Sequence, residues 1–274
     1  MDISLADVKQ GRRIASGKFG EVFLGELDGE RVVLKKPRKN VRGAGDFFDA
    51  EGLINRKLKG CKAVPAFLGV AGADVYLVWK YEGTDTLETF MENPKSLGEL
   101  GRKLGIANGS REQICGRTMR GLLQAVSALH QKGVVHRDIK PANILVAESS
   151  SSRGGGIFSL GGGSGHTLKL IDLGGAADLR TGVNYSDSET VFDPIFAPPE
   201  KYIEGSFGGL FGAVSWLSAK PDLFDAYGAG ICMLMLCVPQ VRPSRRDLPR
   251  RSPPGRRLAV LTIESCRSSR SRPR

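Results

Sequence analysis

The chain has 274 residues, and its 40 Lys and Arg against 29 Asp and Glu give a formal net charge of +11. This length suits one large domain or two small ones, and 41% hydrophobic with 25% charged residues is typical of globular proteins. Collagen, coiled coils and wholesale disorder are excluded. Residues 239–274 hold eleven Arg, one Asp and one Glu, which is +9 of the charge and leaves +2 for the other 238 residues. The total charge therefore says little about what the folded part binds.

The five cysteines form no Cys-x-x-Cys pair and no regular framework. We expect reduced thiols, and the presence of only three histidines argues against a zinc site. The N-terminus has no signal-peptide or transit-peptide character. The most apolar segment, residues 224–238, contains Asp225 and has 15 residues, whereas a membrane span needs about 20. A buried core helix is favoured over a membrane span.

The N-terminal part alternates short β-type runs with turns, and residues 27–30 predict a hairpin turn. The predicted strands are residues 12–14, 21–26, 31–35, 66–70 and 75–80. A helical spacing of apolar residues interrupts them at about 46–58. This order predicts a small β-rich lobe with one helix.

Beyond Gly83 helical patterns dominate, and the clearest runs from Arg111 to Gln131 with Gly133 as its stop. Short β-type runs return at 134–135, 144–146 and 168–171. Two segments have the composition of insertions. Residues 148–166 are rich in Ser and Gly and predict a disordered linker. Residues 205–218 are rich in Gly but keep large apolar side chains, which suit a loop packing on its own domain or a docking surface. The whole pattern predicts an α+β chain with two lobes and a short connector.

The sharpest motif is residues 136–143, His-Arg-Asp-Ile-Lys-Pro-Ala-Asn. It matches HRDxKxxN, the catalytic loop of protein kinases. The chain therefore resembles eukaryotic-type Ser/Thr protein kinases, and the resemblance covers roughly residues 11–238. It implies the two-lobed protein-kinase-like fold, with ATP and Mg²⁺ as cofactors and proteins as substrates.

The resemblance also implies roles for the polar residues. Phosphoryl transfer spreads negative charge over oxygens, so the enzyme needs positioning and cations. Asp138 is expected to accept the proton of the substrate hydroxyl, with Lys140 beside the transferring phosphate. Asn143 and Asp172, the latter in Asp-Leu-Gly instead of Asp-Phe-Gly, are expected to hold Mg²⁺.

Lys35, which closes Val-Val-Leu-Lys, matches the lysine that grips the nucleotide phosphates. Its expected partner is Glu51 on the first helix, because Asp46 and Asp49 fit the register less well. A two-lobed enzyme would bring this pair to the catalytic loop.

Residues 15–22 match the phosphate-covering loop GxGxxGxV with one departure, because Ala15 replaces the first glycine. Trp79 falls at the gatekeeper position behind adenine, a place that also suits a core Trp. Val33 stands where the family has Ala and should narrow the adenine slot. The nucleotide-binding residues expected by resemblance are Ala15, Gly17, Gly20, Val22, Val33, Lys35, Trp79, Lys80, Tyr81, Glu82 and Leu145.

The activation segment is expected between Asp172 and Glu200, ending in Pro198-Pro199-Glu200 where the family has Ala-Pro-Glu. Arg137 matches the residue that binds a phosphate on this segment. Candidate phosphate carriers are Thr181, Ser186, Ser188 and Thr190, and Asp187 and Glu189 offer permanent negative charge. Asp193 stands where Ser/Thr kinases place a Thr facing the catalytic loop, which puts the preference for hydroxyl amino acids in doubt.

Several further stretches are similar to the state-transition thylakoid kinases of algae and plants, among them residues 79–83, 176–180 and 221–230. By this resemblance Asp225 is expected to brace the backbone of the catalytic loop. The resemblance implies a chloroplast kinase acting on photosynthetic membrane proteins. That family adds a transit peptide and a membrane anchor before the kinase domain, and we recognise neither pattern within these 274 residues. Without the resemblance we would expect a cytoplasmic location.

The resemblance stops after Val238, where a kinase continues with more helices. Residues 239–274 contain six Pro, six Ser and no helical period. A disordered basic tail that binds RNA or anionic lipid is one interpretation, and an artefact such as a misread exon boundary is the one we favour. The expected layout is a small lobe 1–78, a hinge 79–83, an incomplete large lobe 84–238 and a disordered Arg/Pro/Ser-rich tail 239–274.

The leading hypothesis is a protein Ser/Thr kinase that uses Mg-ATP. The alternatives are a catalytically impaired or pseudokinase scaffold, and a nucleic-acid-binding protein that uses its tail. Intact catalytic positions favour the first over the second. The absence of interleaved basic and aromatic residues in 1–238 argues against the third, so no specific nucleic acid is expected.

Overall fold

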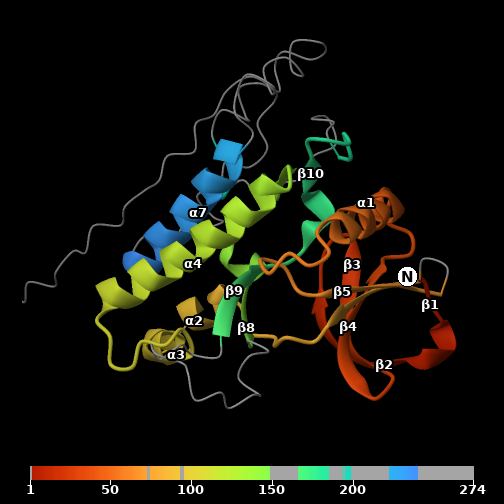
Figure 1. Ribbon diagram of the computed structural model, residues 1–274, viewed down its shortest axis with the longest axis horizontal. Helices are drawn as coiled ribbons and strands as arrows, with labels where there is room; N and C mark the ends of the chain where they lie inside the picture. The colour runs from red at the N-terminus through yellow and green to blue at the C-terminus, as the bar shows by residue number, and fades with distance from the viewer. Residues whose placement is uncertain are drawn as a thin grey trace, which may run out of the picture.

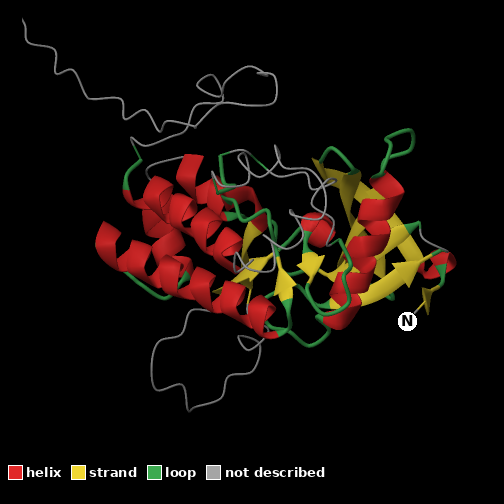
Figure 2. Cartoon of the chain, turned by 90° about the horizontal axis from the view of Figure 1, so that it is seen from above, coloured by secondary structure: helices red, strands yellow, loops and turns green. Residues whose placement is uncertain are grey.

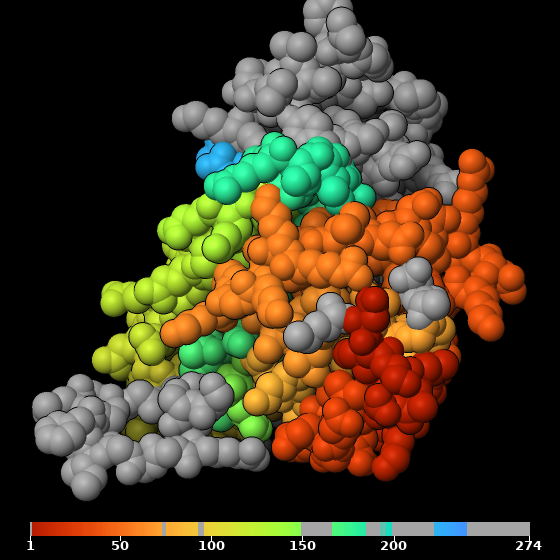
Figure 3. All heavy atoms as spheres, turned by 45° about the vertical axis from the view of Figure 1, so that its right-hand side comes forward, coloured from red at the N-terminus to blue at the C-terminus, as the bar shows by residue number. Residues whose placement is uncertain are grey.

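The computed structural model describes residues 2–72, 75–92, 96–148, 166–184, 193, 195–198 and 222–239. A sheet-rich lobe formed by the N-terminal part lies beside a largely helical lobe (Figures 1 and 2). In the space-filling view of Figure 3 the two pack directly against each other. The predicted α+β, two-lobed architecture is confirmed.

The small lobe is built on a six-stranded sheet of order β1-β5-β6-β4-β3-β2. Its strands are β1 (Asp2–Ile3), β2 (Val8–Ser16), β3 (Gly20–Leu27), β4 (Glu30–Pro37), β5 (Phe67–Ala71) and β6 (Tyr76–Lys80), and a 3₁₀ turn, η1 (Leu5–Asp7), follows β1. All pairings are antiparallel except that of β1 with β5. The hairpin turn between β3 and β4 is confirmed, because Asp28 and Gly29 have φ of 51° and 79°. Strand β2 is longer than the predicted strand 12–14. Strand β1 was not predicted, because two residues are too few to show an alternation of apolar and polar side chains.

Helix α1 (Ala44–Lys57) lies across one face of this sheet (Figure 2). Phe48 of the helix packs with Val70, Leu77 and Trp79 of the sheet. The other face buries a second apolar cluster around Phe23 and Leu34. The helix is thus held by burial of one face, and it begins two residues before the predicted start.

The large lobe contains α2 (Leu87–Glu92), α3 (Ser96–Lys103), α4 (Arg111–Gln131) and α7 (Asp222–Cys237). Helix α4 has its predicted bounds because Ser110 and Gln113 cap its first turn reciprocally and Gly133 takes a φ of 75° after its end. Helices α4 and α7 lie side by side (Figure 1). Within the described residues, no helix is long and apolar enough to cross a membrane.

Two short two-stranded sheets flank the loops that carry the predicted site residues of the large lobe. Strand β7 (Val134–Val135) pairs with β10 (Ala177–Asp178), and β8 (Ile144–Glu148) pairs with β9 (His166–Leu170). The 3₁₀ turns η2 (Pro141–Asn143) and η4 (Leu173–Gly175) follow the two loops that bear the predicted catalytic aspartates. This pairing brings loop 136–140 next to loop 171–172. The predicted linker within 148–166, the segment 205–218 and the tail from 240 lie outside the described residues.

Candidate active site

A cleft of about 700 Å³ opens between the two lobes. Every predicted site residue except Tyr81 lines it. The Tyr81 ring instead lies under the guanidinium of Arg31, 4.4 Å from its centre, and its main-chain N–H donates to Arg31 O at 3.2 Å. Tyr81 therefore faces away from the cleft and fastens the connector to β4.

Lys35 joins the two lobes at the base of this cleft. Its Nζ lies 2.6 Å from Glu51 Oε2 on α1 and 2.7 Å from Asp172 Oδ1 in the large lobe. The predicted contact with Glu51 is confirmed. Lys35 is placed by β4, where Val33 and Lys35 point to the same side of the strand.

The charges of these three groups depend on one another. Burial lowers the pKa of Lys35, but the carboxylates of Asp172 and Glu51 outweigh it and raise that pKa overall. The same ammonium lowers the pKa of Asp172. Burial raises the pKa of Glu51 despite the opposing effect of Lys35. The raised pKa favours the cationic form of Lys35, which is the form that could bind phosphate.

Asp138 lies across the cleft with its two carboxylate oxygens in different surroundings. Oδ2 accepts hydrogen bonds from Lys140 Nζ at 2.7 Å and from Asn143 Nδ2 at 2.8 Å. Oδ1 is buried and has no hydrogen-bond partner among the described residues. Burial raises the pKa of Asp138, and the nearby Lys140 offsets part of this rise. A carboxylate that is fixed through one oxygen and has a raised pKa is suited to accepting a proton.

The backbone of this loop is fixed from behind by Asp225, which is completely buried on α7. Its Oδ2 and Oδ1 accept the main-chain N–H groups of His136 and Arg137, each at 2.8 Å. The predicted brace is confirmed. His130 Nε2 lies 2.8 Å from the same carboxylate, a third contact that the motif did not indicate.

Two non-glycine residues of the site have left-handed backbones, Arg137 with φ 65° and Asp172 with φ 63°. Such conformations cost free energy and persist where the surroundings impose them. Arg137 is held by the Asp225 brace and by the bond from its Nε to Gly175 O at 2.7 Å. At Asp172 the unusual turn aims the carboxylate back at Lys35.

The phosphate-covering loop closes over Lys35. Gly17 N–H donates to Gly20 O at 2.9 Å. A Cβ on Gly20 would sit 3.1 Å from Lys35 Cε, so glycine keeps the space beside the lysine open. At the loop tip Phe19 stacks on Phe47 of α1 with ring centres 4.2 Å apart. The sequence motif did not indicate this stack.

The same groups fit a magnesium nucleotide. Asp172 and Asn143 offer carboxylate and amide oxygens, the ligands that Mg²⁺ prefers. Lys35 occupies only Oδ1 of Asp172, and Asn143 uses its amide nitrogen for Asp138. Among the described residues no hydrogen bond to the remaining oxygen of either residue is found, and both residues line the cleft.

The adenine end of the cleft is apolar. Val22, Val33 and Leu145 line it, and Trp79 closes its rear with 9% of its surface exposed. The Trp79 indole N–H donates to Asn55 Oδ1 at 3.0 Å. Trp79 is thus a core residue that also lines the cleft, and its role as gatekeeper stays a prediction.

The described part of the activation segment is tied to α1 through Asp178. This buried carboxylate accepts hydrogen bonds from Lys57 Nζ, Thr181 Oγ1 and the N–H of Arg180. Asp193 Oδ1 accepts from the N–H of Ile195 at 3.1 Å and so caps the turn that follows it. The other predicted phosphate carriers, Ser186, Ser188 and Thr190, lie outside the described residues, as do Asp187, Glu189, Pro199 and Glu200.

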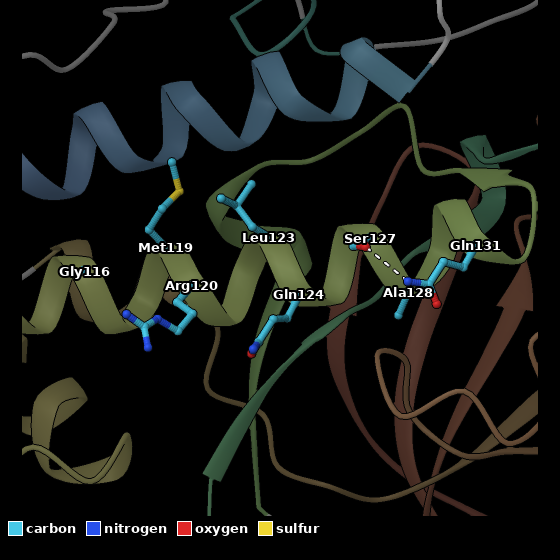
Figure 4. Close-up of a pocket in the computed structure, with 8 residues that line it drawn as sticks. All are labelled: Gly116, Met119, Arg120, Leu123, Gln124, Ser127, Ala128 and Gln131. Atoms are coloured by element: carbon cyan, nitrogen blue, oxygen red, sulfur yellow. Dashed lines mark hydrogen bonds between the residues drawn. The ribbon is translucent and has the colours of Figure 1, made fainter.

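A second groove, of about 650 Å³, runs along α4 (Figure 4). Its lining comes from this one helix and includes Met119, Leu123 and Gln131. Its lining contains no carboxylate, and the hydroxyl of Ser127 accepts a hydrogen bond from Gln131 Nε2 at 3.4 Å. None of the predicted site residues lines this groove. The inter-lobe cleft is therefore the candidate active site.

A family model described as protein kinase domain matches residues 8–216. The chain belongs to the protein kinase family. It is 34% identical over 250 residues to the chloroplast serine/threonine-protein kinase STN8 of Arabidopsis thaliana, covering 80% of this chain and 47% of that protein. It is 32% identical to the chloroplast kinase STN7 of the same plant, covering 86% of this chain and 44% of that one. The chain thus spans less than half the length of these two relatives.

Among solved structures, a homolog of the kinase Stt7 from Micromonas algae, soaked with ATP, matches with a TM-score of 0.69 and 29% identity. The match covers 84% of this chain and 70% of that one. The expected kinase fold and the similarity to chloroplast serine/threonine-protein kinases are both confirmed.

Proposed function

We propose that this chain is an ATP-dependent protein kinase that transfers the γ-phosphate of Mg-ATP to Ser or Thr hydroxyls of protein substrates. The observation that carries the proposal is the environment of Asp138. Its Oδ1 is buried and unbonded in the same cleft where Lys35 holds Glu51 and Asp172. A proton acceptor and a phosphate-gripping cation share one cavity.

The nucleotide would lie between a small lobe 1–78 and a large lobe 84–238, with residues 79–83 as the hinge. The N–H groups of Lys80 and Tyr81 already bond to Ala66 O and Arg31 O. Within the described hinge the main-chain donors left for adenine are those of Glu82 and Gly83, which both line the cleft. Lys35 then grips the phosphates, and Gly17 and Gly20 cover them.

In the transfer step the substrate hydroxyl oxygen attacks the γ-phosphorus while the carboxylate of Asp138 accepts its proton. The bond from the γ-phosphorus to the β-phosphate oxygen breaks, and ADP leaves. Lys140, 2.7 Å from the other Asp138 oxygen, stands where charge builds up on the phosphoryl oxygens. Asn143 and Asp172 would hold Mg²⁺, which neutralises phosphate charge when bound.

The relatives STN8 and STN7 carry chloroplast in their names. On this basis we place the chain in the chloroplast and its substrates among thylakoid proteins. A panel of thylakoid and unrelated proteins, incubated with the chain and labelled ATP, tests this assignment. Equal labelling of both groups would contradict it.

The mechanism is tested with Asp138→Asn and Asp172→Ala in the full chain. Each should lower the phosphoryl-transfer rate at least ~10²-fold while circular dichroism stays unchanged. Asp7→Asn, an exposed carboxylate on η1, is the control and should keep the full rate. Unchanged phosphate incorporation in either active-site variant would refute the mechanism, and no incorporation by the unaltered chain would favour a binding scaffold.

A further inference from the structure

Asn55 is a buried amide in the middle of the small lobe, with only 2% of its surface exposed. It lies on α1 one helical turn after Glu51. Burying an amide is costly unless its polar atoms find partners. Here Nδ2 donates to Glu51 O at 2.9 Å, and Oδ1 accepts from Trp79 Nε1 at 3.0 Å. Both ends of the amide are used.

These two bonds have different consequences. The bond to Glu51 O folds the side chain back on the preceding turn of α1, which fixes the direction of Oδ1. The bond from Trp79 then joins that fixed oxygen to β6. Trp79 pairs across the sheet with Val33, two residues before Lys35. The link therefore connects the helix that carries Glu51 to the strands that carry Lys35.

The helix is close enough to the sheet for such a short side chain to reach. At Gly52 a Cβ would lie 3.2 Å from Leu77 Cδ2 of β6, so the absence of a side chain permits the approach. Apolar contacts such as Phe48 on Leu77 hold α1 against the sheet, but they are not directional and tolerate rotation of a helix about its axis. A hydrogen bond requires a defined geometry, so it does not tolerate such a rotation.

We infer that Asn55 is a positioning residue: the hydrogen bond from Trp79 sets the rotation of α1 at which Glu51 meets Lys35. This inference rests on the proposed kinase function for its consequence, because the ion pair prepares Lys35 for phosphate. The bond itself is a property of the chain that can be measured without any turnover.

The first test observes the bond directly. The chain has two tryptophans, so ¹⁵N-indole labelling of the full chain gives two N–H signals, and Trp216→Phe assigns the one from Trp79. Asn55→Leu, which is close to isosteric, should move the Trp79 signal and speed its exchange with solvent. The control is Thr118→Val on α4, which removes another buried hydrogen bond, from Thr118 Oγ1 to Ile114 O. It should leave the Trp79 signal in place.

The second test is a double-mutant cycle of Asn55→Leu and Trp79→Phe. It is read by calorimetric binding of a non-hydrolysable Mg-ATP analogue and by hydrogen exchange of the amides of residues 44–57. Each single variant leaves one buried polar group unpaired, so each should weaken binding about fivefold, or about 1 kcal/mol, and speed exchange in α1. The double variant should be no worse than either single one.

The outcomes separate this inference from the proposed function. An unmoved Trp79 signal in Asn55→Leu, or strictly additive effects in the cycle, would overturn the inference even if the chain is an active kinase. Coupling in the cycle without phosphoryl transfer by the unaltered chain would support the inference and remove the proposed function. If the analogue does not bind, the indole signal and the exchange of α1 decide alone.

Discussion

Replacing Asp178 by Asn should weaken the fold by removing the charge that ties α1 to the segment after Asp172. Asp178 is 3% exposed. Burial raises the pKa of its carboxyl, but the bonds from Lys57, Thr181 and Arg180 outweigh this effect and hold the pKa at about 2.

The size of the effect follows from the difference between the pKa of this carboxyl in the folded chain and its pKa in the unfolded chain. An unperturbed aspartate has a pKa of about 3.9, so a folded value near 2 corresponds to roughly 2.5 kcal/mol of unfolding free energy at neutral pH. Because the folded pKa is depressed, this contribution is present above the unfolded pKa and is lost as the pH falls through about 2. The amide of Asn keeps an acceptor for the main-chain N–H groups but loses the charge, so we expect a loss of about 2 kcal/mol at pH 7.

Urea unfolding of the unaltered chain, Asp178→Asn and Glu26→Gln between pH 7 and pH 2.5 measures this. Glu26 pairs with Lys9 at 3.4 Å, and these side chains are 45% and 78% exposed. Exposed pairs contribute about 0–1 kcal/mol, so the control should change little. The gap between the unaltered chain and Asp178→Asn should narrow as the pH falls. A gap that is constant over this range, or no larger than that of the control, would refute the reasoning.

Three further outcomes are expected. Gly228→Ala should destabilise the chain by about 1–3 kcal/mol, because its Cβ would lie 2.9 Å from Ile139 O. Gly230→Ala on the same helix would meet no described atom within 4 Å and should stabilise the chain by about 0.5–1 kcal/mol. Equal urea midpoints of the two variants would contradict this. Trp79→Gly should bind ATP-competitive inhibitors with bulky rear substituents at least about tenfold more tightly, and equal affinities would place Trp79 elsewhere. Because the pKa of Asp138 is raised, kcat/KM should fall on the acid side at a pH above the ordinary range of aspartate, and an acid limb at or below that range would count against Asp138 as the base.

Sequence patterns predicted the helices and strands whose ends and apolar spacing are set by residues close together in the chain. Helix α4 was predicted from its apolar period and from Gly133 at its stop, and the structure adds the cap formed by Ser110. The catalytic loop and the Lys35–Glu51 contact came from motifs whose spacing is fixed by the chemistry they serve. Even there the sequence could not orient each side chain, and Tyr81 faces Arg31 instead of the cleft because a cation attracts its ring.

The contacts that the sequence did not reveal are buried polar pairs between distant residues. Asn55 and Trp79 are 24 residues apart, and Lys57 and Asp178 are 121 apart. In the sequence Asn55 is an ordinary polar residue of a helix and Lys57 an ordinary surface charge. Only the packing of α1 against the sheet and the large lobe gives either of them a partner. Strand β1 was missed for a related reason, because two residues carry no period.

These distant contacts explain how Glu51 can be a buried charge. Burial raises the pKa of Glu51 and so opposes its ionised form, which Lys35 must then stabilise at close range. That requires α1 to be held firmly along the face that carries Glu51. Phe47 stacks on Phe19 one turn before it, Asn55 bonds to Trp79 one turn after it, and Lys57 pairs with Asp178 at the end of the helix. The three contacts reach the phosphate-covering loop, the sheet and the activation segment. We therefore expect that a displacement of any of these parts would shift the Lys35–Glu51 pair, and with it the proposed phosphate contact of Lys35.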